Sequence, residues 1–302
     1  MHDPEMAAQE VWAYFKRLNK GLTNSGRKVN LIGVGAGRCG TSMIQLLFEN
    51  SRDIYATPVK EVNYFGVMEE KHHPRGWSRR DYERIFLDAD SEKYVCEISP
   101  VYLTQPGSAE SILQYNQDIK IIITLREPLS RSISLYKHLY REHGNNSIEK
   151  YFTEGLSQVK LNAVRETDWL SPGKNILQSQ YADAIAKFLK LFPRENICIL
   201  LYEDLRYDSA HWINTLESFI GLDLDSSFLS CNVNASEDVP LDLTPECANK
   251  LLSHFLPDVI RTSEILGIDL KTKWYSHTEQ TPQRSASLIM PEPDNPQRPT
   301  RE

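Results

Sequence analysis

This chain of 302 residues has only five cysteines and no long hydrophobic run. The cysteine number is odd and no pair has CxxC spacing, which favours neither a disulfide framework nor a zinc site. No apolar stretch reaches membrane-spanning length, and residues 1–10 are acidic and polar where a signal peptide would be basic and then apolar. We therefore expect a cytoplasmic protein that binds no metal and no membrane.

An excess of positive charge is also missing. The formal net charge is −7, so binding to nucleic acid by broad phosphate neutralisation is not expected, although a local basic pocket for a small anion remains compatible with this balance. Length and a hydrophobic content of 40% predict one large α/β domain or two small ones. The adjacent His72 and His73 have no partner cluster, so they do not indicate a metal site.

Residues 29–48 (VNLIGVGAGRCGTSMIQLLF) are the stretch around which the rest of the chain is interpreted. A short apolar run typical of a buried parallel strand leads into four closely spaced glycines and then into apolar residues at helical spacing. Glycines allow backbone N–H groups to turn inward, and a helix N-terminus adds partial positive charge. The stretch predicts a seat for a phosphate-like anion, the alternative being a glycine-rich turn without a ligand.

The spacing Gly35-x4-Gly40-Thr41-Ser42 resembles a P-loop, but Thr41 stands where a Walker A loop carries lysine. The nearby cation is Arg38, whose guanidinium can bind the oxygens of a group being transferred. Loss of the lysine weakens, without removing, the alternative of a nucleoside or metabolite kinase.

Further strands are predicted at residues 53–56, 94–100, 120–125 and 196–202, and helices at 7–18, 129–142, 147–162, 176–192, 211–220 and from about 245 to 266. The alternation predicts an α/β fold, P-loop-like and three-layered, with a central parallel sheet flanked by helices. Residues 1–28 are expected to form an N-terminal helix and linker, 29–276 the main domain, and the proline-rich residues 277–302 a disordered tail.

Two other groups of residues are expected near the carboxyl edge of this sheet, where open α/β sheets bind ligands. Arg126 ends the strand at 120–125, and Ser130 and Ser134 follow on one helix face, which together make a second anion seat. Lys60 and Glu61 follow the strand at 53–56. A capping arginine with solvated serines, and an exposed surface ion pair, are the alternatives for these two groups.

In this order the motifs resemble the sulfotransferases that use 3′-phosphoadenosine 5′-phosphosulfate (PAPS), most closely the bacterial and heparan-sulfate-type branch. The resemblance runs from about residue 29 to 275 and rests on the glycine loop together with KEVNYF, RGWSRRDYERIF, CEISPVYL, LREPLSRSISLY and YEDL. It implies a PAPS-dependent transfer of a sulfuryl group to an acceptor hydroxyl of a small metabolite or a sugar, without a metal.

The resemblance also implies roles for individual residues. Arg126 and Ser134 would hold the 3′-phosphate, Arg38 would stabilise charge on the bridging oxygen, and Glu61 would be the general base. The 5′-phosphosulfate would lie in a loop formed by Gly37, Arg38, Cys39, Gly40, Thr41 and Ser42. The lysine of the branch's Glu-Lys-Ser-Pro motif is replaced by Ile98, and Lys60 is the candidate substitute.

The resemblance is incomplete in one respect, and one further alternative has to be weighed against it. A basic motif for late nucleotide contacts is missing, and residues 232–236 are the nearest candidate for them. A nucleotide-binding module without catalysis would be expected to lack Arg38 or Glu61, and both are present.

Overall fold

The computed structural model describes residues 26–66, 78–140, 147–165, 168, 170–230 and 243–275. The predicted N-terminal helix at 7–18, the tail at 277–302, most of the basic segment that contains His72 and His73, and the candidate nucleotide contacts at 232–236 lie outside the described residues. The predicted limits of the main domain, 29–276, stay a prediction.

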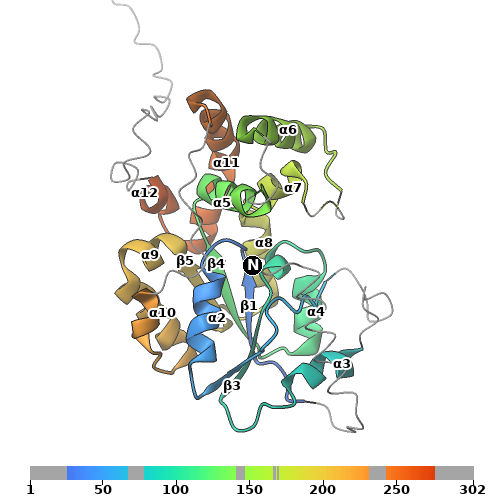
Figure 1. Ribbon diagram of the computed structural model, residues 1–302, viewed down its shortest axis with the longest axis vertical. Coiled ribbons are helices and arrows are strands. Elements are labelled where there is room, and N and C mark those ends of the chain that lie inside the picture. Colours follow the sequence, from blue (N-terminus) through green and yellow to red (C-terminus); the bar gives the residue numbers. More distant parts are fainter. Residues whose placement is uncertain are drawn as a thin grey trace, which may run out of the picture.

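The described residues form a parallel sheet of five strands in the order β2-β3-β1-β4-β5 (Figure 1). The strands are β1 (Leu31–Gly35), β2 (Ile54–Ala56), β3 (Tyr94–Ile98), β4 (Lys120–Leu125) and β5 (Ile197–Leu201). β4 has the predicted bounds because its continuous apolar run is buried between two layers. Since β1 lies between β3 and β4, the loop that follows it opens at the point where the strand order reverses, the ligand position of such sheets.

Helices cover both faces of the sheet, which confirms the predicted three-layer α/β fold (Figure 1). One face packs against α2 (Thr41–Glu49) and α10 (Ser209–Ile220), whose apolar sides meet in one core cluster. The other face packs against α4 (Ser108–Tyr115), α8 (Ala182–Leu191) and α12 (Leu270–Tyr275). The short helix α3 (Arg79–Glu83) lies beside this second layer.

A separate helical cluster consists of α5 (Pro128–Tyr140), α6 (Ile148–Lys160), α7 (Pro172–Leu177) and α11 (Pro245–Leu266), in the upper part of Figure 1. α5 begins at Pro128, one residue before the predicted start at 129, since proline is favoured in the first turn of a helix. The Glu127 carboxylate caps this helix, since it accepts bonds from the amides of Leu129 (2.9 Å) and Ser130 (2.7 Å). This capping fixes the direction in which α5 leaves the end of β4.

The predicted single helix at 176–192 is wrong. α7 ends at Leu177 and α8 begins at Ala182. The Asp258 carboxylate of α11 accepts bonds from the amides of Tyr181 (2.6 Å) and Ala182 (3.2 Å), so it caps α8 from another helix. The predicted strand at 196–202 corresponds to β5, which ends at Leu201 because α9 (Tyr202–Tyr207) begins at the next residue.

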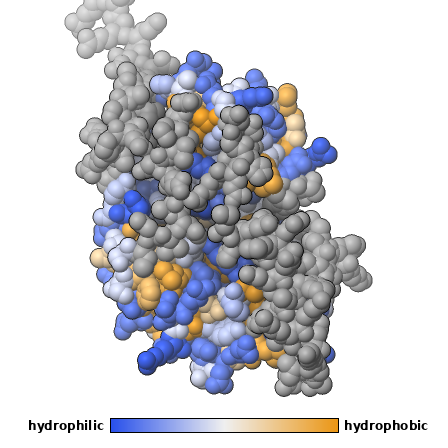
Figure 2. Space-filling view, in the orientation of Figure 1, coloured by the Kyte–Doolittle hydropathy of each residue, from blue (hydrophilic) through white to orange (hydrophobic). Residues whose placement is uncertain are grey.

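The coloured residues on the face shown in Figure 2 are of both polar and apolar kinds. Hydrophilic colours cover much of the coloured surface in Figure 2, with hydrophobic colours in smaller areas between them. Leu161 and Leu170 are the most exposed large hydrophobic side chains in the described part of the chain, at 71% and 68%. Among these residues, no helix combines the length and the apolar character that a membrane crossing requires.

Candidate functional site

The glycine loop connects β1 to α2 at the centre of the sheet. Gly35 has a φ of 110°, and a Cβ there would lie 2.1 Å from the Pro100 carbonyl oxygen, so only glycine fits. Gly40 precedes α2 with a φ of 91°, and α2 receives no side-chain cap within the described structure. The first N–H groups of α2 therefore face the loop without a capping side chain, as an anion seat requires.

The structure brings Arg38, Arg126 and Ser134 together. Arg38, in the loop, donates from Nε to Ser134 Oγ of α5 at 3.2 Å. Arg126, at the end of β4, donates from Nη1 to the Arg38 carbonyl oxygen at 3.3 Å. Its guanidinium also lies 4.3 Å from the centroid of the Tyr202 ring, a cation–π contact that orients it. The two anion seats that the sequence predicts are therefore contiguous.

Arg131 is a residue of this site that the sequence reasoning missed. It is 3% exposed and donates from Nε to the Gly37 carbonyl oxygen at 3.2 Å. Its Nη1 donates to Asn175 and Ser179 of the α7 region, each at 3.0 Å. The buried guanidinium thus ties the glycine loop to α5 and α7. The spacing of Arg131 and Ser134, one turn apart on α5, is the signal that could have indicated it.

The cations of the site lie close enough to affect one another. Burial lowers the pKa of Arg38, and the nearby charges of Arg126 and Arg131 lower it further. Burial likewise lowers the pKa of Lys60, with Arg38 adding to the effect while Glu61 and Glu49 oppose it. A bound anion would relieve this like-charge crowding, so the electrostatics favour an anionic ligand.

Lys60 and Glu61 lie in the loop after β2, four and five residues beyond its end at Ala56. Lys60 Nζ donates to Ser42 Oγ, in the first turn of α2, at 2.5 Å. Glu61 has an exposed side chain and a φ of 61°, and its backbone N–H donates to the Ile98 carbonyl oxygen at 3.2 Å. The pair therefore reaches the glycine loop from a second element, with the carboxylate on the solvent side.

Cys39 and Thr41 are both buried in the loop, at 1% and 5% exposure. Burial raises the pKa of the Cys39 thiol to about 12, and its Sγ lies 3.6 Å from the Gly37 carbonyl oxygen. These properties fit a packed loop residue and not a reactive thiol.

Glu97 is the fourth residue of β3 and Ser99 follows the strand directly, so both lie at its carboxyl end. Both side chains are 0% exposed, because Tyr82 and Tyr102 cover them and hydrogen-bond to Glu97. They lie beneath the loop that carries Lys60 and Glu61.

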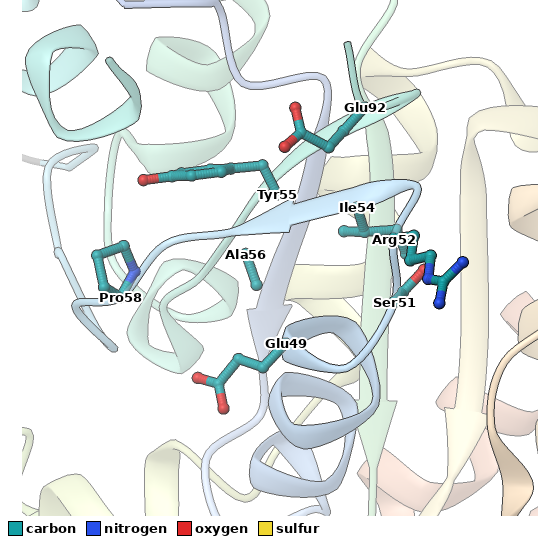
Figure 3. A pocket seen from close by; sticks show the side chains of 8 residues that line it. All are labelled: Glu49, Ser51, Arg52, Ile54, Tyr55, Ala56, Pro58 and Glu92. Atoms are coloured by element: carbon teal, nitrogen blue, oxygen red, sulfur yellow. The ribbon is translucent and has the colours of Figure 1, made fainter. Parts of the chain in front are cut away.

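A hollow of about 600 Å³ lies along the edge strand β2, with Glu49, Arg52, Tyr55 and Glu92 among its lining residues. Figure 3 shows Glu49 and Glu92 on opposite sides of the β2 ribbon. None of its eight lining residues belongs to the predicted donor site, so the hollow is a separate surface feature. Within the described residues, no group of three or more His, Cys, Asp or Glu side chains could hold a metal ion.

Comparison with known proteins agrees with this geometry. The chain is similar in structure to a sulfotransferase from Alicyclobacillus acidocaldarius, with a TM-score of 0.66, 25% sequence identity and coverage of 82% of this chain and 99% of that one. It is 26% identical over 109 residues to the membrane-associated sulfotransferase kil1 of Dictyostelium discoideum, which covers 35% of this chain and 22% of that protein.

The heparan sulfate glucosamine 3-O-sulfotransferase 5 of Mus musculus is 24% identical over 196 residues, which covers 65% of this chain and 53% of that protein. The chain thus spans about half the length, or less, of these two curated relatives. The family model described as sulfotransferase domain matches residues 30–247. Since this match covers more than half of the chain, and the similar proteins are themselves sulfotransferases, the chain belongs to the sulfotransferase domain family, as its motifs predicted.

Proposed function

We propose that this chain transfers the sulfuryl group of PAPS to an acceptor hydroxyl of a small metabolite or a sugar. The observation that carries the choice of donor is the contact between Lys60 Nζ and Ser42 Oγ at 2.5 Å. In a P-loop the hydroxyl at the position of Ser42 binds Mg²⁺, and the preceding residue is the phosphate-binding lysine. Here an ammonium from another element meets that hydroxyl, and Thr41 precedes it. The arrangement favours a donor that is used without Mg²⁺ over ATP.

The cationic side chains and N–H groups of the site fit PAPS, which carries negative charge on the 5′ and the 3′ side of its ribose. The N-terminus of α2 and the side chains of Arg38 and Lys60 would hold the 5′-phosphosulfate. Arg126 and Ser134 would hold the 3′-phosphate, and Arg131 would keep the loop in place. PAPS supplies an activated sulfuryl group joined to a phosphate that can leave.

The remaining chemistry belongs to residues of the chain. Arg38 and Lys60 would stabilise the negative charge that develops on the bridging oxygen, and hydrogen-bond donors that are already in position make such stabilisation effective. Glu61 would accept the proton of the acceptor hydroxyl as its oxygen attacks sulfur in line. Its exposed side chain leaves it open to an acceptor arriving from solvent. The mouse relative is named as a sulfotransferase of heparan sulfate glucosamine, and this name supports a sugar hydroxyl as one acceptor class.

The donor is tested by calorimetric titration with adenosine 3′,5′-bisphosphate, the product nucleotide, and with ATP, each with and without Mg²⁺. We expect micromolar or tighter binding of the bisphosphate that is independent of the metal. Binding of ATP only in the presence of Mg²⁺, without binding of the bisphosphate, would instead establish the kinase alternative.

The base is tested by Glu61→Gln in a transfer assay with labelled PAPS and a panel of sugar and small-molecule hydroxyls. We expect turnover to fall by roughly a hundredfold or more while nucleotide affinity is unchanged. Glu49→Gln is the matched control, because Glu49 is also an exposed glutamate whose charge acts on Lys60, at the other end of α2. Near-normal turnover in Glu61→Gln would refute the assignment of the base.

A further inference from the structure

The loop that carries Lys60 and Glu61 has an unusual backbone. Glu61 and Asn63 both have positive φ angles, 61° and 52°, which residues with a side chain rarely adopt. Such a conformation persists only where the surroundings hold it in place. The contacts of Asn63, Tyr64 and Phe65 identify what holds it.

Two buried hydroxyls accept bonds from the backbone of this loop. Ser99 Oγ accepts from the amide of Asn63 at 3.0 Å. Tyr102 OH accepts from the amide of Tyr64 at 2.6 Å and from that of Phe65 at 3.3 Å. Three consecutive N–H groups, two to four residues after Glu61, are therefore bound to side chains of the segment that follows β3.

Both hydroxyls donate their single proton to the same atom, Glu97 Oε1. Tyr102 OH lies 2.9 Å from it, and Ser99 Oγ also donates to it. Because the proton of each hydroxyl is directed at Glu97, the lone pairs face the loop amides. An acceptor at the position of Oε1 thus keeps the hydroxyl protons pointed away from the loop, so that the hydroxyl oxygens can accept from the loop amides.

Tyr82 completes the cluster without contacting the loop backbone. Its hydroxyl donates to the other oxygen, Glu97 Oε2, at 2.7 Å. Burial raises the pKa of Glu97, and the bonds from Ser99, Tyr82 and Tyr102, together with one from the backbone amide of Asn63, oppose this effect. Where Glu97 takes up a proton, Oε2 is the oxygen that can carry it, since Oε1 already accepts two donated protons. Oε1 remains an acceptor in both states.

We propose that Glu97 is a positioning residue for the transfer reaction, which acts through Ser99 and Tyr102 on the backbone of residues 63–65 and so places Glu61 and Lys60 at the glycine loop. This inference rests on the proposed function, in which Glu61 is the base. Glu97 does not touch the reacting atoms and contributes by holding the loop in one conformation.

Tyr102→Phe and Tyr82→Phe form a matched pair that tests the proposal. Both tyrosines are 0% exposed, both donate to Glu97, and both rings pack against Phe65, with centroids 5.6 Å and 5.2 Å away. Of these two tyrosines, Tyr102 is the one whose hydroxyl accepts from the loop amides. We expect Tyr102→Phe to lower kcat by roughly ten- to a hundredfold with the KM for PAPS unchanged, and Tyr82→Phe to keep the parent kcat.

Variants of Glu97 extend the test. Glu97→Gln keeps an acceptor oxygen where Oε1 lies, so it should retain most of the parent kcat, whereas Glu97→Met removes the acceptor and should lose activity as Tyr102→Phe does. Equal losses in Tyr82→Phe and Tyr102→Phe, or none in either, would show that the cluster only stabilises the fold and would overturn the proposal. If Tyr102→Phe does not fold, Ser99→Ala replaces it, since it removes the hydroxyl that accepts from the Asn63 amide and donates to Glu97.

A second readout does not depend on activity. Amide hydrogen exchange of residues 63–65 should be faster in Tyr102→Phe than in the parent and unchanged in Tyr82→Phe. If the parent binds no bisphosphate and transfers no sulfuryl group, the proposed function fails. The exchange difference would still support the inference that Tyr102 holds the backbone of residues 63–65. Equal exchange in the two variants overturns the inference whether or not the parent is active.

Discussion

Glu203 offers a prediction about stability whose sign and size follow from its surroundings. It lies in the first turn of α9, where Oε1 accepts a bond from the amide of Glu127 at 3.0 Å. Oε2 is buried and has no hydrogen-bond partner in the described part of the chain. Burial raises the pKa of Glu203 from its ordinary 4.5 to about 7, although the Glu127 amide and Arg126 act against this.

A raised pKa means that the folded state binds the proton more tightly than the unfolded state. The stabilisation is therefore fully present below pH 4.5 and is lost as the pH rises through about 7. With these two pKa values, the free energy of unfolding falls by roughly 1.3 kcal/mol between about pH 6 and about pH 8 through this one group. Glu203→Gln has no proton to lose and should not show this part of the fall.

Denaturant unfolding of the parent and of Glu203→Gln, measured from about pH 5 to about pH 8, gives the difference that isolates Glu203 from the other titrating groups. We expect the two proteins to converge at the acidic end, and the variant to gain stability relative to the parent as the pH rises. A constant difference between the two curves over this range would refute the reasoning, because it would mean that Glu203 titrates alike in the folded and unfolded states.

Three further predictions follow from single contacts. Arg126→Ala should weaken binding of adenosine 3′,5′-bisphosphate by roughly ten- to a hundredfold in calorimetry, and unchanged affinity would place the 3′-phosphate elsewhere. Gly35→Ala should cost about 2 kcal/mol or more in unfolding experiments, since its Cβ would collide with the Pro100 carbonyl oxygen at 2.1 Å; a neutral result would mean that this loop relaxes freely. Asp258→Ala should cost about 1–3 kcal/mol through loss of the α8 cap, and Asp258→Asn, which keeps one acceptor, should cost less; equal losses would argue against capping.

The parts of the site that could be predicted from the sequence are those formed by residues close together in the chain. A buried strand, closely spaced glycines and a helix start in residues 29–48 indicate the anion seat, because backbone geometry and the N–H groups of one turn suffice to form it. The strand end at Arg126 and the helix that starts at Pro128 are visible for the same reason. The roles of Glu61 as base and of Lys60 as the substitute cation were inferred from family resemblance, and they remain proposals.

The parts that escaped prediction depend on residues far apart in the chain. Arg131 resembles a solvent-facing helix position until α7 brings Asn175 and Ser179 to its guanidinium. The burial of Glu97 and Ser99 likewise depends on Tyr82, 15 residues before Glu97, and on Tyr102.

The sequence by itself determined the strands, the glycine loop and the charges at the strand ends, because periodicity and turn chemistry act over a few residues. The tertiary structure alone decided where α7 stops and α8 starts, since the carboxylate that caps α8 belongs to Asp258, 76 residues beyond Ala182. It also decided that Lys60 meets Ser42 and that the hydroxyls of Ser99 and Tyr102 bridge the Glu97 carboxylate and the backbone of residues 63–65. Such contacts form only when the elements pack, because burial removes water as the competing partner and leaves each polar group the partner that the fold provides.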